Sequence, residues 1–346
     1  MSEPIRLREQ GSLFVGGREG RSLAPSTFHA GLVGRPDYDD PGRIVRGQTY
    51  VEYQVPAEVS GPPVVMLPGG CHTAVAYHRA PDGGDGWRDV WLRRGSPVYL
   101  VDFARRGRAG FDPTIIVQVR RGDLPPSALP NVTTLTAEAL WPMFRFGPEF
   151  GTAWEGVQFP VEHLDRYLAQ IVPDFDLPEL RNGLVGGAVI ELLESIGGAV
   201  LVSHSASVPV GWAVVRARPE LVIAHVAVEG PGSPMDGMGP SPVDADGLAG
   251  GEPIENELRW YANVPSLAVF GDYVDRDELW TVFRASCRRF ADDVAARGGV
   301  AEVLDLPAAG VTGNTHVPMC DRNAADVAGR IADWVSARRA PTVPRA

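Results

Sequence analysis

The stretch Gly198-Ala-Val-Leu-Val-Ser-His-Ser-Ala-Ser207 decides the fold class. Its apolar first half predicts a buried strand and the residues from about Val208 onward predict a helix, so Ser205 falls on the turn between them. This arrangement matches a nucleophile elbow, G-x-S-x-G, whose strained backbone requires small neighbours two positions to either side. Here those neighbours are Ser203 and Ser207, which are small but are not glycines. The alternative is a serine-rich strand end whose hydroxyls cap the following helix.

Segments that are apolar on both faces recur along the chain and alternate with helical patterns. Strands in the middle of a parallel sheet are buried on two sides and have this composition. The expected strands cover residues 64–67, 98–102, 199–203, 221–228, 266–270 and 301–306, and the expected helices cover residues 208–218, 278–296 and 324–337. This alternation predicts an α/β fold with a mostly parallel, doubly wound central sheet flanked by helices.

The N-terminal region and a long middle segment depart from this alternation. From Ser12 the chain has a hairpin-like start, and residues 48–55 alternate in polarity, so we expect antiparallel edge strands there. Residues 113–182 are rich in proline and aromatic residues and too long for a simple connection. We expect a core of residues 1–112 and 183–346, with residues 113–182 inserted as a cap over the carboxyl edge of the sheet. The alternative is a peripheral insertion that does not contact substrate.

Composition excludes several classes of partner. The 346-residue chain is 44% hydrophobic and 22% charged, as in ordinary globular proteins, and its net charge of −11 opposes binding to nucleic acid. No apolar run approaches the roughly 20 residues that cross a bilayer, so no membrane span is expected. The N-terminus lacks an apolar signal-like stretch, which predicts a cytoplasmic protein. The three widely separated cysteines predict reduced thiols (Cys71, Cys287 and Cys320).

A serine nucleophile needs an imidazole to accept its proton and an acid to orient that imidazole. His316 follows the last expected strand and precedes the last expected helix, where the fold that carries the nucleophile elbow places its histidine, in the chain order serine, acid, histidine. His204 would point away from Ser205, and His225 lies within a strand and is interpreted as a core residue. Three further histidines lie outside the core pattern (His29, His78 and His163).

Two carboxylates compete for the third position. Glu229 ends the strand expected at residues 221–228, whereas Asp272 follows the next strand along the chain. Both would lie at the carboxyl edge of the sheet, where open α/β sheets bind ligands. Spacing alone slightly favours Asp272, and either residue could instead be a solvated loop carboxylate or a helix cap.

The negatively charged intermediate of acyl transfer needs two backbone N–H donors, one from the residue after the nucleophile and one from a loop after an early strand. Ala206 would supply the first donor. The second is expected from residues 67–73, whose paired glycines allow a close approach to substrate, with Gly70 favoured and Cys71 beside it. Paired glycines are also common in ordinary turns at the end of a strand.

Several motifs occur in a characteristic order along nearly the whole chain. Among them are Gly107-Arg-Ala-Gly, Phe144-Arg-Phe-Gly-Pro, Gln158-Phe-Pro-Val, Leu201-Val-Ser-His-Ser, Val269-Phe-Gly-Asp and Leu306-Pro-Ala-Ala-Gly-Val-Thr-Gly-Asn-Thr-His. This order resembles the bacterial esterase 713-like family of α/β-hydrolases. The resemblance implies that Ser205 is the nucleophile, that His316 is the base and that Glu229, not Asp272, is the acid.

The resemblance also identifies residues 67–73 as the oxyanion loop. Typical members of the family carry two adjacent cysteines there, joined by a disulfide, and often a histidine before the loop glycine. This chain has Gly70-Cys71 and Pro68 at those places, so the disulfide cannot form, while the backbone donors remain.

We therefore predict a carboxylic-ester hydrolase that acts on a small-molecule ester through an acyl-enzyme intermediate. No cofactor is expected, because neither a phosphate-cradling motif nor metal-ligand spacing is present. Aromatic residues of the insertion are expected to form an apolar roof (Trp141, Phe144, Phe146 and Trp154). The same triad could cleave an amide, a lactone or a carbon–carbon bond, and the fold could serve a non-catalytic binding protein. A homodimer is one option for the assembly.

Overall fold

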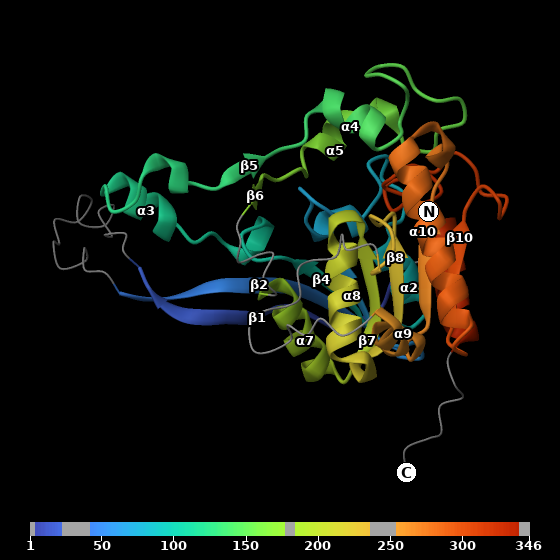
Figure 1. The fold of residues 1–346 in the computed structure, drawn as a ribbon, viewed down its shortest axis with the longest axis horizontal. Helices are drawn as coiled ribbons and strands as arrows, with labels where there is room; N and C mark the ends of the chain where they lie inside the picture. Colours follow the sequence, from blue (N-terminus) through green and yellow to red (C-terminus); the bar gives the residue numbers. More distant parts are fainter. Residues whose placement is uncertain (1–3, 23–41, 177–183, 236–253, 339–346) are drawn as a thin grey trace, which may run out of the picture.

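The computed structural model describes residues 4–22, 42–176, 184–235 and 254–338 and contains an eight-stranded central sheet (Figure 1). In spatial order the strands are β1 (Leu7–Arg21), β2 (Arg43–Pro56), β4 (Val98–Asp102), β3 (Val64–Leu67), β7 (Ala199–His204), β8 (Val222–Val228), β9 (Ser266–Phe270) and β10 (Ala301–Asp305). The last six run parallel, and β1 and β2 are antiparallel to their neighbours. The predicted α/β class is confirmed, and the six predicted parallel strands match to within one residue at each end.

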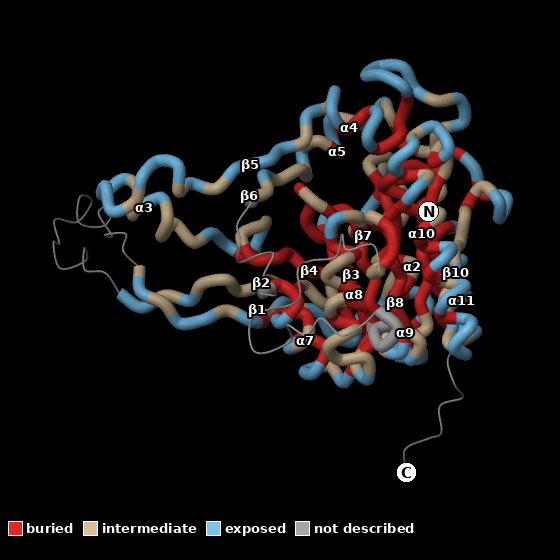
Figure 2. The backbone as a smooth tube through the Cα atoms, viewed as in Figure 1, coloured by how far each residue is buried: buried red, intermediate tan, exposed pale blue. Residues whose placement is uncertain are grey.

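Burial explains why the central strands were recognisable. Every residue of β3, β7 and β9 is buried, so both faces of these strands require apolar side chains. Figure 2 shows this buried layer running through the middle of the molecule. The carboxyl ends of β3, β7, β8 and β9 therefore meet at one edge of the sheet, where the loops that follow them come together.

The two N-terminal strands form the antiparallel edge that the sequence predicts. The hairpin-like start predicted from Ser12 lies within β1, which continues through Gly16 and Gly17, with φ values of 62° and 85°, and pairs with β2 up to Arg21. Glycine tolerates this left-handed backbone without a steric penalty. His29, which the sequence placed outside the core pattern, lies outside the described residues.

Helices cover both faces of the sheet. On one face α2 (Trp87–Arg93) and α11 (Ala324–Ala337) share a hydrophobic core with the strands. On the other face lie α7 (Leu184–Ile196), α8 (Val208–Ala217), α9 (Ile254–Ala262) and α10 (Glu278–Ala295). The three predicted helices, α8, α10 and α11, are confirmed. The sequence interpretation did not include α2, α7 or α9; α2 has only seven residues, and α7 carries a glycine pair that weakens helix propensity.

The segment that follows β4 leaves the sheet and returns before α7. It contains α3 (Thr114–Arg120), β5 (Asn131–Thr133), α4 (Ala137–Met143), α5 (Leu164–Leu168) and β6 (Asp174–Asp176), with β5 and β6 paired as a separate two-stranded sheet. In Figure 1, α4 and α5 lie above the carboxyl edge of the main sheet, while α3 extends to one side. Residues 177–182 of the expected insertion lie outside the described residues.

Candidate active site

Ser205 lies on a sharp bend between β7 and α8 and has a φ of 51°. A residue with a Cβ atom is strained in this left-handed region, and such strain concentrates at functional sites. The hydroxyl of Ser207, at the start of α8, does not cap that helix and lies 3.0 Å from the Leu67 carbonyl oxygen. Ser207 does accept from the backbone N–H of His204 at 2.9 Å, in a capping box of the short 3-10 turn Ser205–Ser207. Ser205 itself caps no helix, and the bend has the geometry of a nucleophile elbow.

Backbone strain extends beyond this bend. Six non-glycine residues in the described part of the chain have a positive φ, and four of them surround the site (Cys71, Arg145, Ser205 and Glu229). They come from four separate segments of the chain: the loop after β3, the insertion, the end of β7 and the end of β8. This clustering marks the carboxyl edge of the sheet as the functional region.

The three predicted triad residues lie together. The Oγ atom of Ser205 is 2.9 Å from Nε2 of His316, and Nδ1 of His316 is 3.3 Å from Oε2 of Glu229. Because a carboxylate only accepts hydrogen bonds, Nδ1 carries the proton and Nε2 accepts from the serine hydroxyl. His316 and Glu229 are buried, with exposed fractions of 2% and 0%, whereas Ser205 is partly exposed. The arrangement can remove a proton from Ser205.

The competing carboxylate has other partners. Asp272 accepts hydrogen bonds from the backbone N–H groups of Gly313, at 2.8 Å, and Tyr273, at 2.7 Å. It forms no hydrogen bond with His316 in the part of the chain that the structure describes. Glu229, and not Asp272, therefore lies next to the imidazole, although sequence spacing alone had slightly favoured Asp272 as the acid.

Electrostatics keep the acid ionised and the imidazole neutral. Burial raises the pKa of Glu229, but the charge of Arg145 and hydrogen bonds from His316 and Arg145 outweigh it and lower the pKa from 4.5 to about 2. Burial lowers the pKa of His316 below 6.5, and Glu229 opposes this shift. A neutral imidazole beside a carboxylate is the form that a general base requires.

The loop that carries His316 is fixed by hydrogen bonds from several directions. Asp321 accepts from the backbone N–H and the hydroxyl of Thr315, both at 2.8 Å. The backbone N–H of His316 donates to the carbonyl oxygen of Phe144 at 3.0 Å. Its carbonyl oxygen accepts from Nε2 of His204 at 2.8 Å, so His204 links the elbow to the histidine loop, although its ring also lines the pocket with Ser205. This agrees with the structural role predicted for His204.

A second serine–histidine pair lies beneath the elbow. Ser203 Oγ is 2.6 Å from His225 Nε2, and both side chains are fully buried. The other ring nitrogen of His225 has no hydrogen-bond partner among the described residues, and neither residue lines the pocket. Burial lowers the pKa of His225 to about 3, so it is neutral. The pair lacks both an acid and access, and His225 is the core residue that the sequence predicted.

The loop after β3 packs directly against the elbow. A Cβ atom on Gly69 would lie 2.7 Å from Nδ1 of His204 and 3.2 Å from Cβ of Ser205, so only glycine fits there. The backbone N–H of Gly70 donates no hydrogen bond within the described residues. The backbone N–H of Cys71 donates to Oδ2 of Asp174 at 3.1 Å. Gly70 therefore has the free donor, and the donor of Cys71 is occupied.

An ion pair supports this loop from the outside. Nε of Arg106 donates to Oδ1 of Asp174 at 2.7 Å, and Nη1 donates to the carbonyl oxygen of Gly69 at 2.9 Å. The side chains of Arg106 and Asp174 are 14% and 21% exposed, so the pair is largely withdrawn from solvent. These contacts hold the loop at Gly69 and Cys71, on either side of Gly70; the family resemblance implies a disulfide between positions 70 and 71 in other members.

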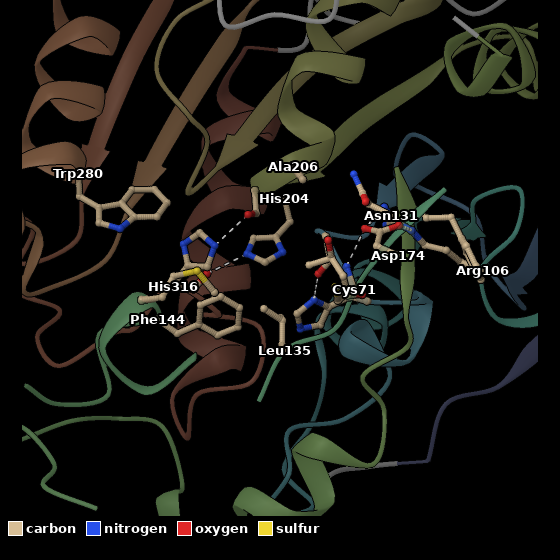
Figure 3. Close-up of a pocket in the computed structure, with 16 residues that line it drawn as sticks. Cys71, Arg106, Asn131, Leu135, Phe144, Asp174, His204, Ala206, Trp280 and His316 are labelled. Carbon is tan, nitrogen blue, oxygen red and sulfur yellow. Dashed lines mark hydrogen bonds and ion pairs between the residues drawn. The ribbon is translucent and has the colours of Figure 1, made fainter. Parts of the chain in front are cut away.

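A cavity of about 730 Å³ opens beside Ser205 and is lined by residues of the core and of the insertion. Figure 3 shows two unlike sides: Trp280, His316 and Phe144 on one, and Arg106, Asp174 and Asn131 on the other. The insertion contributes a large share of the wall (Asn131, Thr133, Leu135, Met143, Phe144, Asp174 and Phe175). Among the expected roof aromatics only Phe144 lines it, while Phe146 stacks on Phe159 with ring centroids 3.9 Å apart.

Sequence reasoning missed several residues of the site. Arg145 binds Glu229, Arg106 and Asp174 support the oxyanion loop, and Trp280 lines the pocket from α10. The only available signal for Arg145 was its place inside the Phe144-Arg-Phe-Gly-Pro motif. No pattern in the sequence connected Asp174 with a loop 103 residues earlier.

Comparisons with known proteins identify relatives of the chain. No family model matches the chain. A solved structure titled as that of a novel bacterial esterase is 32% identical and covers 98% of this chain and 99% of its own, with a TM-score of 0.85. A fungal protein named as the probable secreted lipase phiG is 28% identical over 328 residues, which are 85% of this chain and 87% of that protein.

The chain belongs to the bacterial esterase 713-like family of α/β-hydrolases. Membership of this esterase family confirms the predicted fold and the predicted class of reaction, carboxylic-ester hydrolysis. In the described residues of this esterase no helix is long and apolar enough to cross a membrane. Within those same ranges no three His, Cys, Asp or Glu side chains are grouped as a metal site would require.

Proposed function

We propose that the protein hydrolyses small-molecule carboxylic esters by two-step acyl transfer at this site, with Ser205 as nucleophile, His316 as general base and Glu229 as the acid that orients the imidazole. The observation that carries this proposal is the pair of contacts of 2.9 Å from Ser205 to His316 and 3.3 Å from His316 to Glu229. Ser205 and His316 line a cavity large enough for a small substrate.

In the first step Oγ of Ser205 attacks the ester carbonyl carbon while Nε2 of His316 takes the hydroxyl proton. The carbonyl oxygen becomes an oxyanion, which accepts hydrogen bonds from the backbone N–H groups of Gly70 and Ala206. The intermediate then collapses, its bond to the alcohol oxygen breaks, and His316 returns the proton to that oxygen. The products of this step are the free alcohol and an acyl group on Ser205.

In the second step a water molecule attacks the acyl carbon and gives its proton to His316. The new oxyanion uses the same two N–H donors, the acyl-oxygen bond breaks, and the proton passes from His316 to Oγ of Ser205. Glu229 stays ionised throughout and stabilises the imidazolium that forms in each step. We assign Cys71 a supporting place in the oxyanion loop, because its N–H donates to Asp174.

We further propose that residues 113–182 act as a cap on a core formed by residues 1–112 and 183–346. The contribution of the insertion to the pocket wall supports this division. The apolar side formed by Trp280 and Phe144, against a polar side at Asp174, favours esters with one apolar and one more polar group. Saturation kinetics with esters that differ only in one of the two groups test this preference.

The test of the proposed function compares the two serines beside the bend. Ser205→Ala is expected to abolish both hydrolysis of short p-nitrophenyl esters and reaction with a fluorophosphonate probe. Ser203→Ala keeps the small side chain that the bend requires and is expected to retain both. No reaction of folded wild-type protein with the probe would favour a binding protein, whereas labelling without ester turnover would favour an amide, a lactone or a carbon–carbon bond as substrate.

For location and assembly we propose a cytoplasmic protein and a homodimer. All three cysteines lie in the described residues and none forms a disulfide, as expected in a reducing compartment. The fungal relative is named as secreted, so cell fractionation is the decisive measurement for location. Sedimentation equilibrium tests the assembly.

A further inference from the structure

Arg145 is a buried cation that the two-step mechanism does not use. It lies in the insertion directly after α4, with a φ of 62° and 2% of its side chain exposed. Its Nη2 donates to Oε1 of Glu229 at 2.7 Å, and its Nε donates to the carbonyl oxygen of Asp272 at 2.9 Å. Its guanidinium carbon lies 5.0 Å from the ring centroid of Trp280. The guanidinium is therefore fixed from three sides.

The carboxylate of Glu229 divides its two oxygens between two partners. Oε1 accepts from Arg145 and from the backbone N–H of Gly271, while Oε2 faces Nδ1 of His316. An ionised carboxylate with no exposed surface is costly unless a counter-charge and hydrogen bonds compensate it. Arg145 supplies that counter-charge, and its hydrogen bond fixes which oxygen remains for the histidine.

The charged and titratable groups around His316 come from every element packed against it. Glu229 and His204 contact it directly, and His72 lies beside His204. Asp321 binds the preceding residue, Thr315, and Asp272 binds Gly313 of the same loop. Burial lowers the pKa values of His204 and His72, so both are neutral at neutral pH. Arg145 is the cation that contacts the triad acid.

We propose that Arg145 is a positioning residue of the triad: it compensates the charge of the buried Glu229 carboxylate, and its bond to Oε1 directs Oε2 to His316. This inference rests on the proposed function. It also gives the insertion a second role, because Arg145 and the carbonyl oxygen of Phe144 hold two members of the triad from outside the core. The cap and the catalytic machinery are thus one unit at this point.

The electrostatic consequence has a definite sign. The positive charge of Arg145 lowers the pKa of His316, in the same direction as burial, whereas Glu229 raises it. Without Arg145 the negative charge of Glu229 is no longer neutralised, so the imidazole binds a proton more strongly. The pH at which His316 becomes a free base then moves upward.

The first experiment compares Arg145→Gln with Arg145→Lys, which retains the charge. In Arg145→Gln we expect the acid limb of the pH profile of kcat/KM to move up by about one unit, and kcat/KM on the plateau to fall by about 100-fold. In Arg145→Lys the limb should stay within a few tenths of a unit. An unchanged limb in a folded Arg145→Gln protein would overturn the inference and leave the proposed function intact.

A second experiment covers a poorly folded Arg145→Gln variant. Glu229→Gln/Arg145→Gln removes both charges and avoids a single buried charge. If Arg145 acts through Glu229, the double variant should have the same kcat/KM as Glu229→Gln within about threefold. Two losses that multiply would show that Arg145 acts elsewhere and would refute the proposal.

A third measurement does not depend on turnover. NMR titration of His316, identified by the loss of its signal in His316→Asn, reports its pKa directly in the wild type and in Arg145→Lys and Arg145→Gln. A rise of about one unit in Arg145→Gln alone supports the inference even if the protein fails every esterase assay. Equal titration in all three proteins contradicts it.

Discussion

Replacing the proposed acid tests the triad at its most selective point. In Glu229→Gln the side chain keeps its size but loses its charge. The amide oxygen takes the place of Oε1, which accepts from Arg145 and Gly271, so the NH2 group faces Nδ1 of His316 and cannot accept its proton. The ring can then present a protonated Nε2 to Ser205, which cannot accept the hydroxyl proton. The loss expected from the wrong tautomer is about 10⁴-fold in kcat, or about 5 kcal/mol of barrier.

The same substitution carries a predictable cost in stability. It leaves the guanidinium of Arg145 buried without its carboxylate partner, which typically costs about 3–5 kcal/mol. Urea unfolding followed by tryptophan fluorescence measures this cost. The kinetics must be recorded without urea and at a temperature well below the midpoint of thermal unfolding. A variant that is destabilised but folded separates the loss of chemistry from the loss of structure.

The matched control is Asp272→Asn at the competing carboxylate. Asp272 accepts backbone hydrogen bonds from Gly313 and Tyr273, so asparagine loses at most one acceptor. We expect a change in kcat of less than about tenfold and a loss of about 1–3 kcal/mol in stability. If Asp272→Asn abolished turnover while Glu229→Gln retained it, the assignment of the acid and the reasoning from the 3.3 Å contact would both be refuted.

Three further predictions concern the loop and the buried histidines. Gly69→Ala should lower kcat by at least about 100-fold with the fold retained on circular dichroism, because its Cβ atom would meet His204; wild-type turnover would contradict the close packing. Asp174→Ala should lower kcat/KM about tenfold. Asp174→Asn should lower it less, because asparagine can still accept from the N–H of Cys71. A larger loss of kcat/KM in Asp174→Asn than in Asp174→Ala would contradict this explanation. The stability of the wild type relative to His72→Gln should fall by about 3 kcal/mol between pH 7 and pH 4, because buried His72, with a pKa of about 4, gains a proton mainly on unfolding. A difference between the two proteins that does not change with pH would exclude this.

The sequence predicted those parts of the fold that repeat a simple pattern. Strands such as β7 are buried on both faces and are therefore continuously apolar, and long amphipathic helices such as α10 show their period. Helix α7 was not predicted, because its glycine pair and its high overall hydrophobicity hide the helical period.

The site divides in the same way. Ser205 and His316 could be predicted because each follows a recognisable strand at the carboxyl edge, and chemistry restricts the residue types that can act there. The choice of Glu229 over Asp272 needed the family resemblance, since both follow neighbouring strands. Arg145 comes from an insertion without a periodic pattern, 84 residues before its partner, so only the folded structure connects the two.

The most direct test of the central claim is to trap the acyl-enzyme and locate it. Wild-type protein treated with a slowly released p-nitrophenyl ester, quenched in acid and digested, should carry one acyl group, and peptide mass spectrometry should assign it to Ser205. Glu229→Gln should accumulate the adduct more slowly, and Ser203→Ala should form it as the wild type does. An adduct on Ser203 or on any residue other than Ser205 would contradict the account. So would ester turnover by Ser205→Ala.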